Sequence, residues 1–113
     1  MFRIQILAAA LAAGSAALAA SGAVMAGDVK AGRQKALQCQ ACHGLDGMAK
    51  LPEAPHLAGQ NEAYLIKALK DYRSGMRKNE MMSLVTANLK DADIADLAAY
   101  YAAIPVTVGT PPK

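Results

Sequence analysis

The sequence of 113 residues is long enough for one small domain and too short for two independently packed ones. Its net charge of +3 comes from scattered basic residues without the aromatic-interleaved stripe of a nucleic-acid surface, so no nucleic-acid partner is expected. It has no Trp and a single Phe at position 2, so its side chains alone cannot build a large core.

The first 26 residues have the pattern of an export signal. Arg3 gives a positive start, no charged residue occurs from Ile4 to Ala26, and Val24-Met25-Ala26 has the small residues of a signal-peptidase site. The uncharged stretch is also long enough to span a bilayer as a retained anchor. Its richness in Ala and Gly favours cleavage. We therefore expect residues 1–26 to be a signal peptide and residues 27–113 to be one domain in the periplasm, without a membrane span.

A first helix is expected directly after this signal. Asp28 is a good N-cap for a helix from about Val29 to Gln38. Gly32 lies inside it, where glycine lowers helix stability by roughly 1 kcal/mol relative to Ala. It marks either a close crossing with another helix or an ordinary surface position, and the sequence leaves both open.

The residues Cys39-Gln40-Ala41-Cys42-His43 form the pattern C-x-x-C-H and include both cysteines of the chain. Two thiols at this spacing can form thioethers with the two vinyl groups of a porphyrin, and the adjacent imidazole can bind the iron. The motif therefore predicts covalent attachment of haem. A buried haem would also supply the apolar volume that the side chains lack.

Three other uses of the cysteines are compatible with the motif alone. A redox dithiol needs a βαβ context, whereas the flanks here have a helical pattern. A zinc site would need both His43 and His56, and His43 is awkwardly placed to share one tetrahedral centre with Cys42. A disulfide between Cys39 and Cys42 is a further alternative. Haem attachment is favoured over all three.

The remaining segments predict helices joined by irregular chain. Residues 51–60 contain two prolines and a glycine, so they cannot form a regular helix and are expected to wrap the haem. Asn61 can cap the next helix and Gly75 can end it. Five apolar or aromatic residues recur in that helix at helical spacing: Tyr64, Leu65, Ala68, Leu69 and Tyr72.

A short apolar segment, Glu80 to Asn88, precedes the last helix, which is expected from about Asp91 to Ile104, where Pro105 stops it. The apolar face of this helix consists of Ile94, Leu97, Ala98, Tyr101 and Ile104. The tail 106–113 is expected to be irregular. No segment has the pattern of a strand, so the fold class is all-α.

Four motifs together resemble the class I c-type cytochromes, in particular the small bacterial periplasmic monohaem type, and one half of the dihaem periplasmic cytochromes. They are C-Q-A-C-H-G at 39–44, P-H-L-A-G-Q at 55–60, the tyrosines and leucines of 64–72, and D-A-D-I-A-D-L-A-A-Y-Y at 91–101. The resemblance implies three main helices plus loops around one covalently bound haem c.

The resemblance also implies roles for individual residues. Cys39 and Cys42 hold the haem, His43 is the proximal iron ligand, and the backbone carbonyl of Pro55 accepts a hydrogen bond from its imidazole. The distal ligand in the family lies seven residues before the leucine that introduces the last helix, which makes it Met82 here.

Other distal ligands are less favoured. Met81 is the runner-up, because adjacent residues on a loop can exchange roles. Met76 is less favoured than Met81. Met48 follows His43 too closely to reach the opposite face, and His56 lies on the proximal loop.

One residue departs from the family pattern. Lys90 stands where a serine usually precedes the acid that opens the last helix. Lysine is a poor N-cap, so we expect Asp91 to cap the helix and the helix to start a residue late.

These residues predict a non-enzymatic one-electron carrier that exchanges electrons transiently with a donor and an acceptor protein. With His43 and Met82 on the iron, no site is open for substrate. Lys35, Lys50 and Lys78 could border the haem edge and steer acidic partners.

Two alternatives stand beside the free carrier. One is the haem-bearing subunit of a periplasmic dehydrogenase such as flavocytochrome c sulfide dehydrogenase, which would be a stable partner. The other is a ligand-binding or catalytic haem, which requires iron without a methionine.

Overall fold

The computed structural model describes residues 26–113, so all of the expected signal peptide except Ala26 lies outside the described residues. The described chain contains five α-helices and one 3₁₀ turn, and no strand. In chain order they are α1 (Val29–Lys35), the 3₁₀ turn η1 (Ala36–Gln38), α2 (Gln40–His43), α3 (Glu62–Ser74), α4 (Glu80–Thr86) and α5 (Asp91–Ala103). The all-α prediction is confirmed.

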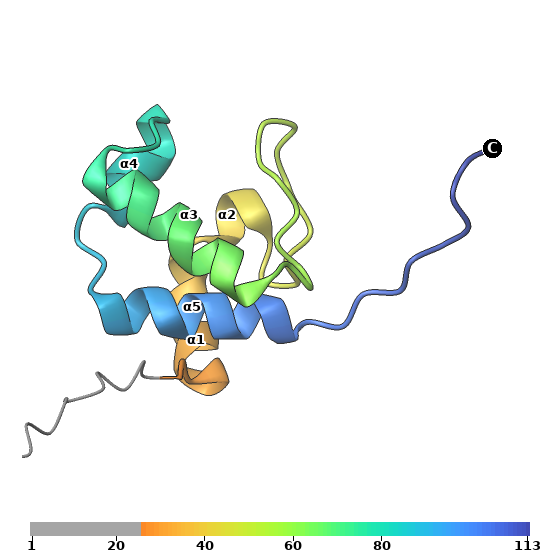
Figure 1. Ribbon diagram of the computed structural model, residues 1–113, viewed down its shortest axis with the longest axis horizontal. Coiled ribbons are helices and arrows are strands. Elements are labelled where there is room, and N and C mark those ends of the chain that lie inside the picture. The colour runs from red at the N-terminus through yellow and green to blue at the C-terminus, as the bar shows by residue number, and fades with distance from the viewer. Residues whose placement is uncertain (1–25) are drawn as a thin grey trace, which may run out of the picture.

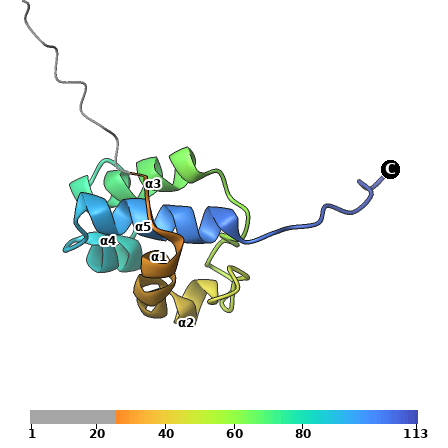
Figure 2. The same cartoon turned by 90° about the horizontal axis from the view of Figure 1, so that it is seen from below.

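Helix α5 is the centre of the arrangement. In Figures 1 and 2, α1 crosses one side of α5, and α3 packs against it from another side. The main core cluster includes four α5 residues together with Ala36 of η1 and Leu65 of α3: Leu97, Ala98, Tyr100 and Tyr101. Ile94 of α5 is fully buried as well, so the apolar face predicted for this helix is confirmed.

The crossing of α1 and α5 requires a glycine. A Cβ atom at Gly32 would overlap the backbone carbonyl of Asp96 and the Cβ atom of Tyr100. Of the two interpretations left open for Gly32, the close crossing is therefore the one observed. Asp28 caps α1 as predicted, since its Oδ1 accepts a 2.6 Å hydrogen bond from the N–H of Ala31. The predicted first helix ends in η1, where the chain tightens to 3₁₀ geometry just before Cys39.

Helices α3 and α4 begin at asparagine caps. Asn61 Oδ1 accepts from Tyr64 N at 3.0 Å, and Asn79 Oδ1 accepts from Met82 N at 3.0 Å. Gly75 ends α3 with φ of 82°, a left-handed conformation that favours glycine. The helix predicted after Asn61 is thus observed as α3, whereas the short apolar segment from Glu80 contains a helix, α4, that the sequence analysis had not predicted.

The start of α5 differs from the expectation. Lys90, not Asp91, occupies the N-cap position, and its backbone N–H donates 2.9 Å to Asp93 Oδ2. Asp91 is the first helical residue, and its carboxylate pairs with Arg73 of α3 at 2.7 Å. The prediction failed because a carboxylate three residues into the helix satisfies the N-cap amide without a capping side chain on residue 90.

The segments between helices are irregular, as expected. Residues 44–61 form an irregular loop between α2 and α3, and residues 105–113 extend away from the helices (Figures 1 and 2). Within residues 26–113, no helix is long and apolar enough to cross a membrane.

Candidate haem site

The C-x-x-C-H motif lies on a short helix that the sequence did not predict. Helix α2 carries Cys42 and His43, and Cys39 occupies its N-cap position. The carbonyl of Cys39 accepts from His43 N at 3.0 Å and from Cys42 N at 3.3 Å. One helical turn therefore separates the two cysteines, which places both side chains on the same side of the turn.

Both thiols are free, so the disulfide alternative is not the arrangement observed. Burial raises the pKa of the Cys39 thiol, with a smaller contribution from Cys42. Within residues 26–113, no three His, Cys, Asp or Glu side chains converge as a metal site. The zinc alternative therefore has no support in this part of the chain.

His43 is a buried residue, with 7% of its surface exposed. Its Nδ1 atom lies 2.9 Å from the carbonyl oxygen of Pro55. A carbonyl can only accept, so Nδ1 carries the proton, and in the neutral ring the lone pair is then on Nε2, where it can bind a metal. The contact predicted for Pro55 is thus present between residues from two different segments of the chain.

Backbone hydrogen bonds fix the loop that carries Pro55. Gly44 reverses the chain directly after His43 with φ of 75°. Lys50 N then donates to Cys42 O at 2.8 Å, which folds the loop back onto α2. His56 Nδ1 accepts from Ala49 N at 2.8 Å, so this exposed side chain is engaged within the loop.

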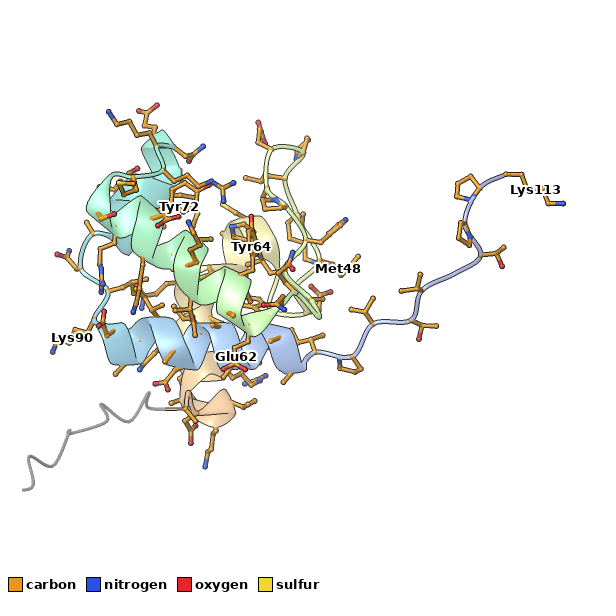
Figure 3. The ribbon with its side chains drawn as sticks, in the orientation of Figure 1. Met48, Glu62, Tyr64, Tyr72, Lys90 and Lys113 are labelled. Atoms are coloured by element: carbon orange, nitrogen blue, oxygen red, sulfur yellow. The ribbon has the colours of Figure 1, made fainter. Side chains whose placement is uncertain are left out.

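The methionines lie at different places. Met82 is half-buried on α4, whereas Met81 is 56% exposed and Met76 is 83% exposed. Met48 lies on the loop after α2, on the opposite side of the molecule from α4 (Figure 3). Met81 and Met82 were treated as loop neighbours that could exchange roles, but both belong to a helix. Adjacent helical residues point roughly 100° apart, so an exchange would require α4 to rotate or unwind.

Two of the three lysines that were expected near the haem edge form ion pairs with aspartates. Lys35 contacts Asp93 at 2.8 Å and Asp96 at 2.5 Å. Lys50 contacts Asp46 at 3.2 Å. Lys78 is exposed before α4.

Two groups of contacts were missed by the sequence analysis. The hydroxyl of Tyr100 donates to Leu45 O at 2.5 Å, and the hydroxyl of Tyr101 donates to Gly44 O at 3.2 Å. The pair of consecutive tyrosines was visible in the sequence, but only the fold shows what the hydroxyl groups contact.

The second missed group joins Arg77, just after α3, to two tyrosines of that helix. The Arg77 guanidinium lies 4.7 Å from the centroid of the Tyr72 ring and donates to the Tyr64 hydroxyl at 3.3 Å. Tyr64 and Tyr72 both extend from α3 on the side away from α5 (Figure 3). This explains why Tyr64 is 48% exposed although it belongs to the predicted apolar stripe.

Residues 29–103 match the family described as Cytochrome c. The chain belongs to the cytochrome c family. Membership implies a covalently bound haem c, and the residues present fit it: two free thiols one turn apart and a buried imidazole with a free Nε2. The resemblance stated from the motifs is confirmed.

Known cytochromes resemble this cytochrome c domain over most of its length. It is 48% identical to cytochrome c4 of Pseudomonas aeruginosa over 84 residues, which cover 74% of this chain and 42% of that protein. It is 48% identical to cytochrome c-554(548) of Halomonas halodenitrificans over 79 residues, which cover 67% of this chain and 95% of that one. The chain thus spans less than half the length of the cytochrome c4 relative.

Solved structures show the same fold. Reduced recombinant cytochrome c4 from Pseudomonas stutzeri matches with a TM-score of 0.68 and 41% identity, over 74% of this chain and 49% of that one. Thiosulfate dehydrogenase from Marichromatium purpuratum matches with a TM-score of 0.64 and 33% identity, over 68% of this chain and 19% of that one.

Proposed function

We propose that this domain carries one haem c, attached through Cys39 and Cys42, and passes single electrons between redox proteins of the periplasm. His43 is the proximal ligand and Met82 the distal ligand. When bound, haem c supplies a one-electron Fe(III)/Fe(II) couple whose potential depends on the axial ligands and on hydrogen bonds to them.

The hydrogen bond between His43 Nδ1 and Pro55 O supports this proposal most directly. It orients the ring, holds the proton on Nδ1 and makes Nε2 a better electron donor. A buried histidine that served only as packing would not need to present a free Nε2 beside two unpaired thiols.

The environment of the two methionines supports Met82 as the distal ligand. Its side chain is half-buried, whereas that of Met81 is mostly exposed. Side chains also bind both backbone polar groups of Met82. Its N–H donates to Asn79, and its carbonyl accepts from the Thr86 hydroxyl at 2.7 Å. A thioether ligand raises the reduction potential of the iron, as suits an electron carrier.

Covalent attachment can be tested on the exported protein. Haem should remain with the chain on a denaturing gel, and its mass should show one haem and a new N-terminus after Ala26. The variants Cys39→Ala and Cys42→Ala should each leave a single thioether. A wild-type chain that loses its haem under denaturing conditions would refute the proposal.

Met82→Ala and Met81→Ala, measured separately, test the distal ligand. Met82→Ala should abolish the charge-transfer absorption of a methionine bound to ferric iron, and Met81→Ala should leave it intact. The opposite result would assign the ligand to Met81. If both variants keep the band, neither Met81 nor Met82 is the distal ligand.

The second candidate function is a haem-bearing subunit of a periplasmic dehydrogenase. Its support is the likeness to a thiosulfate dehydrogenase structure, together with the exposed apolar side chains Met81 and Leu84 of α4, the latter 71% exposed. Sedimentation of the native protein distinguishes the two functions. A single species near the mass of the lone chain excludes a stable subunit.

A further inference from the structure

Tyr101 contacts both ends of the loop that runs from Gly44 to Gly59. Its hydroxyl donates to Gly44 O at 3.2 Å, and its own backbone carbonyl accepts from Gly59 N at 3.0 Å. The neighbouring Tyr100 hydroxyl donates to Leu45 O at 2.5 Å. Helix α5 therefore holds the first two carbonyls after His43 and also the point where the loop returns.

The outgoing and returning halves of this loop are joined to each other. Gly47 O accepts from Leu57 N at 2.8 Å and from Ala58 N at 3.0 Å. The returning half carries Pro55, whose carbonyl accepts from His43. Two routes thus connect Tyr101 to the imidazole: one through Gly44, which follows His43 directly, and one through the returning half of the loop.

The tyrosine hydroxyls lie in an environment where such bonds persist. Tyr101 is 3% exposed, Gly44 is buried, and the rings of Tyr100 and Tyr101 meet edge to face at 5.1 Å. Burial raises the pKa of Tyr101 well above its ordinary value, so its hydroxyl keeps the proton that it donates. A phenylalanine ring could fill the same space, so replacing Tyr101 by phenylalanine removes the hydrogen bond to Gly44 and little else.

We propose that Tyr101, assisted by Tyr100, is a positioning residue for His43: the two hydroxyl groups hold the start of the loop at Gly44 and Leu45, and so set the strength of the hydrogen bond from His43 to Pro55. This inference rests on the proposed function, in which His43 binds the iron. A strong Nδ1–H···O bond makes the imidazole a better donor and stabilises ferric iron. Loosening the loop should therefore raise the reduction potential.

The test uses the haem-loaded protein with Tyr101→Phe. We expect haem content and the visible spectrum to remain those of the wild type, the reduction potential to rise, and the Nδ1 proton of His43 to exchange with solvent faster in proton NMR. Tyr100→Phe should shift both readouts in the same direction. If the first variant does not fold, the second decides alone.

Asp28→Ala is the control. It removes the cap of α1 and so destabilises the fold without touching the loop. It should leave the potential and the proton exchange of His43 unchanged. If Tyr101→Phe behaves like this control, the hydroxyl is only structural and the inference is wrong, while the proposed function stands. A wild-type chain without covalent haem would instead overturn the proposed function.

Discussion

The side chain of Asn79 accepts a 3.0 Å hydrogen bond from the backbone N–H of Met82. The first turn of α4 therefore holds the proposed distal ligand. Replacing an asparagine cap by alanine costs about 1 kcal/mol of folding free energy. We expect Asn79→Ala to lose that amount and to lose the methionine-to-iron absorption at a lower urea concentration than the wild type.

Asn88→Ala is the matched control, since Asn88 is exposed and lies beyond the C-terminal end of α4. Urea titrations followed at the charge-transfer band and by far-UV circular dichroism provide both measurements. Equal behaviour of the two variants would mean that the cap does not hold Met82.

Pro55→Ala should raise the reduction potential. The alanine keeps the carbonyl that accepts from His43, but it releases the φ angle that proline fixes, so the bond weakens. Complete loss of the bond, about 0.5–1.5 kcal/mol, felt by the ferric state alone would correspond to roughly 20–60 mV for one electron, so a weakened bond should shift the potential by less than this. Redox titration measures the shift. Pro52→Ala, in the same loop, should have no such effect, and an equal shift in both variants would contradict the prediction.

Gly32→Ala should destabilise the protein, because the new methyl group would overlap the Asp96 carbonyl at the crossing of α1 and α5. Overpacking of this kind costs about 1–3 kcal/mol, against a gain in helix propensity of at most about 1 kcal/mol. Thermal and urea unfolding measure whether the free energy of unfolding falls in this variant. Gly109→Ala, with no neighbour within 4 Å, should leave the stability unchanged. A more stable Gly32→Ala variant would show that the crossing can widen freely.

Acid should weaken the contact between α1 and α5 where the two helices cross. Lys35 lowers the pKa of Asp93, and the N–H of Asp28, followed by Lys35, lowers the pKa of Asp96. Because the folded pKa values lie below the ordinary 3.8, these carboxylates stabilise the fold above about pH 4, and this contribution is lost as the pH falls.

Urea midpoints at pH 7 and about pH 3 test this. Asp96→Asn should unfold more easily than the wild type at pH 7 and should lose less stability on acidification. Glu53→Gln, on the exposed loop, should follow the wild type at both pH values. An undiminished acid response in Asp96→Asn would place the acid-sensitive contacts elsewhere.

The sequence predicted the features that depend on local chemistry. Asp28 and Asn61 identified helix starts because a cap acts within three residues of itself, and Gly75 identified a helix end for the same reason. The pairing of His43 with Pro55 was anticipated from the family resemblance, since nothing local to either residue specifies it.

Features that depend on long-range contact were not predicted. The hydroxyls of Tyr100 and Tyr101 contact carbonyls more than fifty residues earlier in the chain, and no pattern within α5 indicates that partner. The Lys90 N-cap was misjudged because its own side chain was considered and the carboxylate of Asp93 was not.

The contact of α1 with α5 also determines when the domain can fold during synthesis. The two helices stand at opposite ends of the described helical region, so their contact closes the longest loop in it. Such distant contacts form late and slowly. Until α5 has been made, Cys39 and Cys42 belong to a chain without its core. Both thiols are therefore accessible in an unfolded segment at that stage, before η1 and α2 form around them.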